Sequence, residues 1–162
     1  MCQAHQRYEL PMHGMLAACG GFLLAVLWFD LMFDVQALPH TGDVLPEPVL
    51  ASIAAYYRRV TTDAFPMNRL VAAVMLVTIA GSVYALAHGS GWRDGVALVS
   101  CVAPIALAAV RVFPNAVRLA TRADSLERQS ALARAICYDH IACVAAIGLF
   151  VLLQLTASAA AQ

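Results

Sequence analysis

Four long runs of apolar residues divide the chain, and polar segments separate them. The runs cover residues 13–35, 70–87, 96–113 and 141–158. A membrane-spanning helix needs roughly 20 mostly apolar residues, with a range of about 17–25, and each run reaches that length alone or with its flanks. The pattern therefore predicts an all-α fold, a four-helix transmembrane bundle that residues 1–162 form as a single membrane domain.

The first long connection, residues 36–69, carries a helical pattern of its own. Pro48 suits the first turn of a helix, and apolar residues then recur at helical spacing as far as Arg58 and Arg59. We expect an amphipathic helix that lies on the membrane surface with its arginines toward lipid phosphates. The alternative is that this helix forms a lid over polar groups at the end of the bundle.

The second long connection leads into the last apolar run through a helix-start signal. Pro114 and Asn115 follow the third run, and the segment from Asp124 to Glu127 resembles a capping box with Asp124 as the N-cap. Nothing in the sequence interrupts the helix from there to the end of the last run. This predicts a fourth helix of about 35 residues and about 52 Å, which extends well beyond the bilayer.

Composition supports a membrane protein and excludes some other classes. The chain is 62% hydrophobic and only 12% charged, about half the ordinary charged share near 25%. All ten basic side chains are arginines, and ten acidic residues balance them. This balance disfavours nucleic acid as a partner, because nucleic-acid-binding surfaces carry excess positive charge. The five cysteines form no CxxC pair, so neither a disulfide framework nor a zinc site of standard spacing is expected.

The arginines predict the orientation in the membrane. With four spans, the two termini lie on one side and the two long connections on the other. Only Arg7 and Arg93 fall on the side of the termini, and because positive residues are enriched in cytoplasmic loops, we expect the long connections in the cytoplasm. Both termini then lie outside the cytoplasm, with the inner cell membrane as the location. The arginines on the side of the long connections are Arg58, Arg59, Arg69, Arg111, Arg118, Arg122, Arg128 and Arg134.

A candidate cluster of polar residues is expected at the cytoplasmic end of the bundle. Asp30 and Asp34 are four residues apart, so their carboxylates share one helix face. Asp30 lies about one turn inside the membrane boundary, where an ionisable group normally faces the bundle interior and has a partner. Its candidate partners are Arg69, Arg111 and His140. The full candidate cluster is Asp30, Asp34, Arg69, Arg111, Asn115, Asp139 and His140.

Three interpretations of this candidate cluster are open. It could be a collar of ion pairs that locks the helix ends together, or a catalytic or ligand-binding pocket that opens to the cytoplasm. A metal site built on Asp30, Asp34, Asp139 and His140 is the third. Arginine competes for the carboxylates, and the Glu-x-x-His pattern of di-iron bundles is missing, so no metal is predicted there.

Sulfur-containing and imidazole side chains gather at the opposite end of the bundle. Methionine, cysteine and histidine together suit copper, and His13 and His88 could instead serve as axial haem ligands because both fall at the same membrane face. Solvated side chains without a bound group are the simpler interpretation, so we predict no cofactor. The residues concerned are Cys2, His5, Met12, His13, Met15 and His88.

Two pieces of the sequence resemble the anthrone oxygenase-like family of small four-helix membrane proteins. One is Pro114-Asn115 after the third run, and the other is Tyr138-Asp139-His140 at the start of the last. In that family an Asn after the third span and a His entering the fourth recur, and Asn115 and His140 occupy the matching positions. The resemblance implies a cofactor-independent oxygenase or a related enzyme that acts on a hydrophobic aromatic or quinone-like molecule.

Two functions from different classes therefore fit the sequence. The first is a small membrane enzyme, of oxidoreductase or oxygenase type, with an Asp/Arg/His pocket at the cytoplasmic face. The second is a non-catalytic accessory subunit that packs against a larger membrane complex. The lipid bilayer is the expected partner in both, and a homo-oligomer is a further option. The enzyme predicts a cavity that reaches Asp30 and His140, whereas the subunit predicts a closed, ion-paired polar end.

Overall fold

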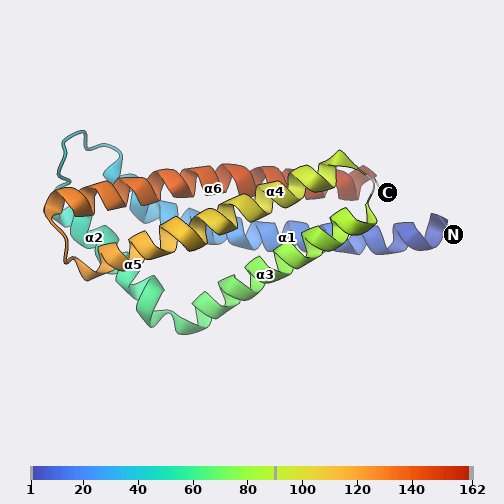
Figure 1. The fold of residues 1–162 in the computed structure, drawn as a ribbon, viewed down its shortest axis with the longest axis horizontal. Coiled ribbons are helices and arrows are strands. Elements are labelled where there is room, and N and C mark those ends of the chain that lie inside the picture. Colours follow the sequence, from blue (N-terminus) through green and yellow to red (C-terminus); the bar gives the residue numbers. More distant parts are fainter. Residues whose placement is uncertain (1, 90, 161–162) are drawn as a thin grey trace.

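The computed structural model describes residues 2–89 and 91–160, and nearly all of them are helical (Figure 1). No strand occurs in these two ranges. The helical elements, in chain order, are α1 (Cys2–Asp34), η1 (Val35–Ala37), α2 (Glu47–Arg58), η2 (Arg59–Asp63), α3 (Phe65–His88), α4 (Trp92–Leu107), η3 (Ala108–Val112), α5 (Phe113–Thr121) and α6 (Leu126–Ala160).

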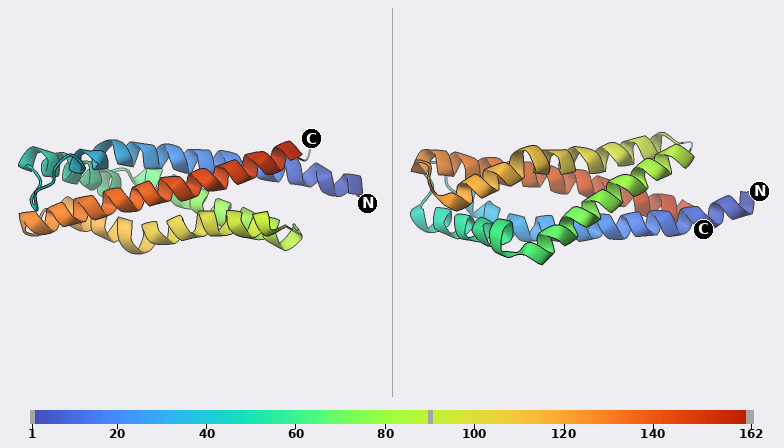
Figure 2. Two further views of the ribbon diagram at one scale, coloured as in Figure 1. Left: turned by 90° about the horizontal axis from the view of Figure 1, so that it is seen from above. Right: turned by 60° about the horizontal axis from the view of Figure 1, so that its bottom comes forward.

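Four helical segments are long and apolar enough to cross a membrane. Each overlaps one of the apolar runs of the sequence, which confirms the four-helix membrane bundle. Both termini lie at one end of the bundle, and α2 and α5 lie at the other (Figure 1). α1 and α6 run side by side in opposite directions (Figure 2). The four segments are Met12–Ala37, Pro66–His88, Trp92–Thr121 and Leu126–Ala157.

The spans pack around an apolar core in the middle of the bundle. Its buried members are Leu16, Leu23, Ala97, Cys101, Ile147 and Phe150. Gly20 on α1 allows α6 to approach closely, because a Cβ atom there would lie 2.6 Å from Val151 Cγ2 and 3.0 Å from the Phe150 ring. Close approach of backbones at small residues is the usual means by which helices associate in lipid.

The amphipathic helix of the first connection, predicted from the sequence, is α2, and it packs against the bundle through its apolar face. Its apolar residues Leu50 and Ile53 are buried against Leu119 of α5 and Ile136 of α6, in a second core outside the central one. Glu47 at the start of α2 also accepts a hydrogen bond from Arg122 Nη2 at 2.7 Å. The apolar face of α2 is thus covered by protein, while Arg58 and Arg59 at its end are exposed.

The third span continues beyond the predicted end at residue 113. A π-helical turn, η3, joins α4 to α5, and Pro114 lies in the first turn of α5. Proline has no N–H to donate to the preceding turn, so the widened turn directly before Pro114 lets the helix proceed without a break. The segment with Pro114 and Asn115 is therefore helical, and the second long connection shrinks to the short link between α5 and α6.

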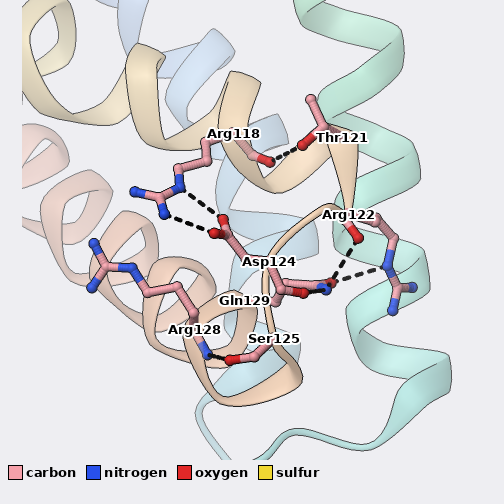
Figure 3. A network of polar contacts seen from close by, with 7 residues as sticks. All are labelled: Arg118, Thr121, Arg122, Asp124, Ser125, Arg128 and Gln129. Atoms are coloured by element: carbon pink, nitrogen blue, oxygen red, sulfur yellow. Dashed lines mark hydrogen bonds and ion pairs between the residues drawn. The ribbon is translucent and has the colours of Figure 1, made fainter.

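The fourth helix is continuous from Leu126 to Ala160, 35 residues in all, as the sequence predicted. The prediction that Asp124 is its N-cap is wrong. Ser125 precedes the helix and its Oγ accepts a hydrogen bond from the Arg128 N–H at 3.3 Å (Figure 3). Asp124 instead accepts hydrogen bonds from Arg118 Nε and Nη2, both at 2.7 Å.

Candidate functional site

Five side chains from three elements form a buried cluster at the α2 end of the bundle. α1 contributes Asp30 and Asp34, α2 contributes Tyr56 and Tyr57, and α6 contributes His140. The spacing of four on α1 directs both carboxylates toward α6 and α2, as the sequence predicted. Three members of the candidate cluster, the two aspartates and the histidine, are therefore brought together by the fold.

Asp34 is the most deeply buried member of this cluster, with no exposed surface. Its Oδ1 accepts a hydrogen bond from the Tyr57 hydroxyl at 2.6 Å, and its Oδ2 lies 2.6 Å from His140 Nδ1. Because an ionised carboxylate only accepts hydrogen bonds, Nδ1 of His140 carries the proton in this arrangement. Such charge-assisted bonds are among the strong ones in proteins, so Asp34 fixes both the tautomer and the orientation of the imidazole.

Asp30 faces the other nitrogen of the same imidazole. Its Oδ1 accepts a hydrogen bond from the Tyr56 hydroxyl at 2.6 Å, while its Oδ2 lies 3.8 Å from His140 Nε2. That separation exceeds ordinary hydrogen-bond reach, about 2.7–3.2 Å for N–H···O. The side chain of Asp30 is 16% exposed, so it is more exposed than the side chains of His140 and Asp34.

Ring contacts hold the two tyrosines of α2 in place. The Tyr56 ring stacks on Phe33 of α1 with centroids 4.1 Å apart, and it meets the Tyr57 ring edge-on at 5.3 Å. Burial, together with the neighbouring Asp34 carboxylate, raises the pKa of Tyr57, and burial beside Asp30 likewise raises the pKa of Tyr56. Both phenols therefore keep their protons and act as hydrogen-bond donors to the carboxylates.

Tyr56 and Tyr57 belong to the buried cluster but not to the candidate cluster predicted from the sequence. The alternative of a lid over polar groups is the arrangement found, because α2 covers Asp30 and Asp34 through these two hydroxyls. The signal that could have identified them is a pair of adjacent tyrosines in an amphipathic helix, where Tyr57 falls among the apolar positions that become buried.

Arg111, one of the arginines proposed as a partner of Asp30, has a different partner in the structure. Arg111 pairs with Asp139, with Arg111 Nε 3.3 Å from Asp139 Oδ2, so the expectation that it partners Asp30 is wrong. His140 does face Asp30, as predicted. Arg69 is exposed near the start of α3, and Asn115 is half-buried on α5. Asp139 itself is buried beside His140 on α6.

The opposite end of the bundle holds two histidines with different surroundings. His13 Nδ1 lies 2.7 Å from Oε1 of Gln154, which is buried in α6. His88 Nδ1 lies 2.9 Å from the Tyr84 carbonyl oxygen, and its ring stacks on the Tyr84 ring. The side chains of Cys2 and His5 fall outside the described part of the chain.

Metal binding was one interpretation of the candidate cluster. In the part of the chain that the structure describes, no three His, Cys, Asp or Glu side chains are grouped so that they could hold a metal ion. The carboxylates of Asp30 and Asp34 are instead engaged by the tyrosine hydroxyls, and Asp34 also by His140.

A surface hollow of about 340 Å³ lies near the buried cluster without reaching it. Arg134 closes one side of this hollow and donates hydrogen bonds to the carbonyl oxygens of His40, Gly42 and Asp43. Neither Asp30 nor His140 lines it. Arg134 therefore fastens the connection between α1 and α2 onto α6. The lining residues are Ala37, Leu38, His40, Thr41, Gly42, Asp43, Arg134 and Tyr138.

Comparisons of this chain with known protein families, with curated proteins and with solved structures found no match.

Proposed function

We propose that this multi-pass membrane protein is an enzyme that carries out general acid–base chemistry on an apolar aromatic or quinone-like molecule, in an oxidoreductase or oxygenase type of reaction. This substrate class follows from the resemblance to the anthrone oxygenase-like family, in which Asn115 and His140 occupy the positions of a recurring Asn and His. The distribution of arginines further places the site at the cytoplasmic face in this proposal.

The observation that carries the proposal is the geometry of the Asp34–His140 pair. The carboxylate holds Nδ1 at 2.6 Å, which leaves Nε2 as the nitrogen that can exchange a proton. An imidazole oriented through one nitrogen by a buried carboxylate is the arrangement that general bases use in enzymes. Nε2 is 3.8 Å from Asp30 Oδ2, so a small shift would let a substrate hydroxyl come between them.

The surroundings of Asp30 fit a substrate that arrives through the membrane. Asp30 lies within the first span, and its neighbours Trp28 and Phe29 are exposed on the outside of the bundle. An apolar aromatic molecule would meet these rings first. In the proposal, Asp30 then receives the polar group of the substrate, and Tyr56 orients that carboxylate.

The test measures oxygen uptake by the purified protein in phospholipid nanodiscs, with anthrone and simple hydroquinones as probes. We expect the protein to raise the rate above that of empty nanodiscs, and His140→Gln or Asp34→Asn to reduce the protein-dependent rate by about 10²–10⁴-fold. Arg118→Gln is the control, because it removes the ion pair of Arg118 with Asp124, which is not part of the buried cluster. A rate equal to that of empty nanodiscs with every probe, or an unchanged rate in His140→Gln, would refute the proposal.

A second candidate function, a non-catalytic accessory subunit, is favoured by a different observation. Asp30 and Asp34 both take their hydrogen-bond partners from within this chain, so the buried cluster can serve as a lock between α1, α2 and α6. Under this function, Asp30→Asn and His140→Gln lower the amount of protein in the membrane together with the cellular phenotype. Under the enzymatic function, abundance stays normal and only the phenotype is lost.

A further inference from the structure

A second polar pair lies beside the buried cluster and has unused hydrogen-bonding capacity. Asp139 is buried on α6, yet its Oδ2 is the one buried side-chain oxygen or nitrogen among the described residues that makes no hydrogen bond. Arg111 Nε is 3.3 Å away from this oxygen, but the geometry is not that of a hydrogen bond. A buried acceptor without a donor is unfavourable, so a donor from outside the chain would stabilise this arrangement.

Arg111 supplies the complementary group. Its side chain is 56% exposed, and no hydrogen bond of the described residues engages its guanidinium. By contrast, Arg118 further along the same span gives two hydrogen bonds to Asp124. The π-helical turn η3 carries Arg111, and such turns occur frequently at functional sites. The guanidinium thus has N–H groups ready for an acceptor next to the oxygen that needs a donor.

Exposed apolar side chains lie close to this pair along the chain. They are Val110 and Phe113, near Arg111 in the sequence, and Ile141, two residues after Asp139. Arg111 and Asp139 lie within the candidate spans Trp92–Thr121 and Leu126–Ala157, close to residues 113 and 141 where the apolar runs of the sequence end and begin. A ligand that fits this place has an apolar body for the membrane and a polar group at its boundary.

We propose that Arg111 and Asp139 form a binding point for the hydroxyl group of an apolar molecule that approaches from the membrane. A hydroxyl donates one hydrogen bond, to Asp139 Oδ2, and accepts another, from the Arg111 guanidinium. A group that only accepts, such as a carboxylate or a phosphodiester, leaves Oδ2 without a donor and is repelled by it. An ammonium group is repelled by Arg111. The inference deepens the proposed function and rests on it for the substrate class, because His140 follows Asp139 directly in α6.

Binding of 1-naphthol to the protein in phosphatidylcholine nanodiscs tests this inference without turnover. Its fluorescence reports binding, and 1-methoxynaphthalene is the matched probe that cannot donate a hydrogen bond. We expect saturable binding of 1-naphthol above that of empty nanodiscs, with an affinity about tenfold lower in Arg111→Gln, as loss of one hydrogen bond to a charged group implies. Arg118→Gln is the matched control and should bind as the unaltered protein does. Asp139→Leu, which removes both acceptor oxygens, should abolish the preference for 1-naphthol over its methyl ether.

Two further arms separate the sources of the hydroxyl and the two proposals. If phosphatidylglycerol in the nanodisc displaces 1-naphthol, and Arg111→Gln prevents this displacement, the natural ligand of the pair is the hydroxyl of a lipid headgroup. If phosphatidylglycerol leaves 1-naphthol binding unchanged, the natural ligand is a separate apolar molecule with a hydroxyl. His140→Gln should keep the preference for 1-naphthol over its methyl ether even if it loses activity, so binding at Arg111 and Asp139 and catalysis at His140 fail separately. Equal binding of 1-naphthol and its methyl ether, or equal weakening in Arg111→Gln and Arg118→Gln, would overturn the inference.

Discussion

Replacing Tyr57 by phenylalanine is the sharpest test of the buried cluster, because α2 offers Tyr56 as a matched neighbour. Each substitution removes one hydroxyl and leaves the ring. Tyr57→Phe removes the one donor that the described residues give to Oδ1 of Asp34, whereas Tyr56→Phe removes the donor to Oδ1 of Asp30. The two carboxylates differ in exposure, since the Asp34 side chain is 0% exposed and that of Asp30 is 16% exposed.

This difference in exposure sets the expected magnitudes. Water cannot replace the lost donor at Asp34, so Tyr57→Phe should lower the free energy of unfolding by about 1.5–3 kcal/mol, the range for hydrogen bonds to charged groups. Water can reach Asp30, so Tyr56→Phe should cost about 0.5–1.5 kcal/mol. Tyr84→Phe is the control, because the Tyr84 ring stacks on His88 on an exposed face of α3 and its hydroxyl makes no hydrogen bond with a described residue. Its change should stay within about 0.5 kcal/mol.

Reversible unfolding in mixed micelles, titrated with dodecyl sulfate and followed by circular dichroism, measures these three values. Repeating Tyr57→Phe in an Asp34→Asn background forms a double-mutant cycle, in which the cost should shrink because the hydroxyl then meets a neutral amide. The reasoning is refuted if Tyr56→Phe costs as much as Tyr57→Phe. An undiminished cost in the Asp34→Asn background would equally show that the hydroxyl acts elsewhere.

Four other predictions concern the rest of the molecule. Burial raises the pKa of Tyr57 above its ordinary 10.0, so above about pH 10 the folded protein retains a proton that the unfolded chain loses. The contribution of Tyr57 to stability is therefore fully present below about pH 10 and falls as the pH rises above it. Thermal unfolding at several pH values should show a shallower fall in Tyr57→Phe. Ser125→Ala should cost about 0.5–2 kcal/mol through loss of the N-cap of α6, measured by the same dodecyl sulfate titration; no change would mean that Ser125 does not cap this helix. Gly20→Ala should destabilise the bundle by about 1–3 kcal/mol because its Cβ would overlap α6, whereas Gly21→Ala, with open space around it, should be neutral or stabilise by up to about 1 kcal/mol. In a variant without its native cysteines, Ser125→Cys should react with an impermeant maleimide only after the cells are permeabilised, whereas Gly91→Cys should react in intact cells. The reverse pattern would contradict the proposed orientation.

The sequence by itself determined the number of spans and the length of α6. In lipid, each span must form its backbone hydrogen bonds within its own helix and must present apolar side chains. The number and the length of the helices can therefore be read from local composition. The same holds for the shared face of Asp30 and Asp34, which follows from helical spacing alone. The sequence also marked α2 as amphipathic, since the periodicity of its apolar residues is a local property.

Only the tertiary structure decided which groups these residues meet. Whether Asp30 meets arginines or tyrosines depends on the rotation of α1 about its axis and on the place where α2 packs. The contact of Gly20 with α6 sets the rotation of α1, and the packing of Leu50 on α5 sets the position of α2. The N-cap of α6 shows the same limit: Asp124 and Ser125 are equally good caps by type. Because the third span continues as α5, it brings Arg118 to Asp124 and leaves the cap to Ser125.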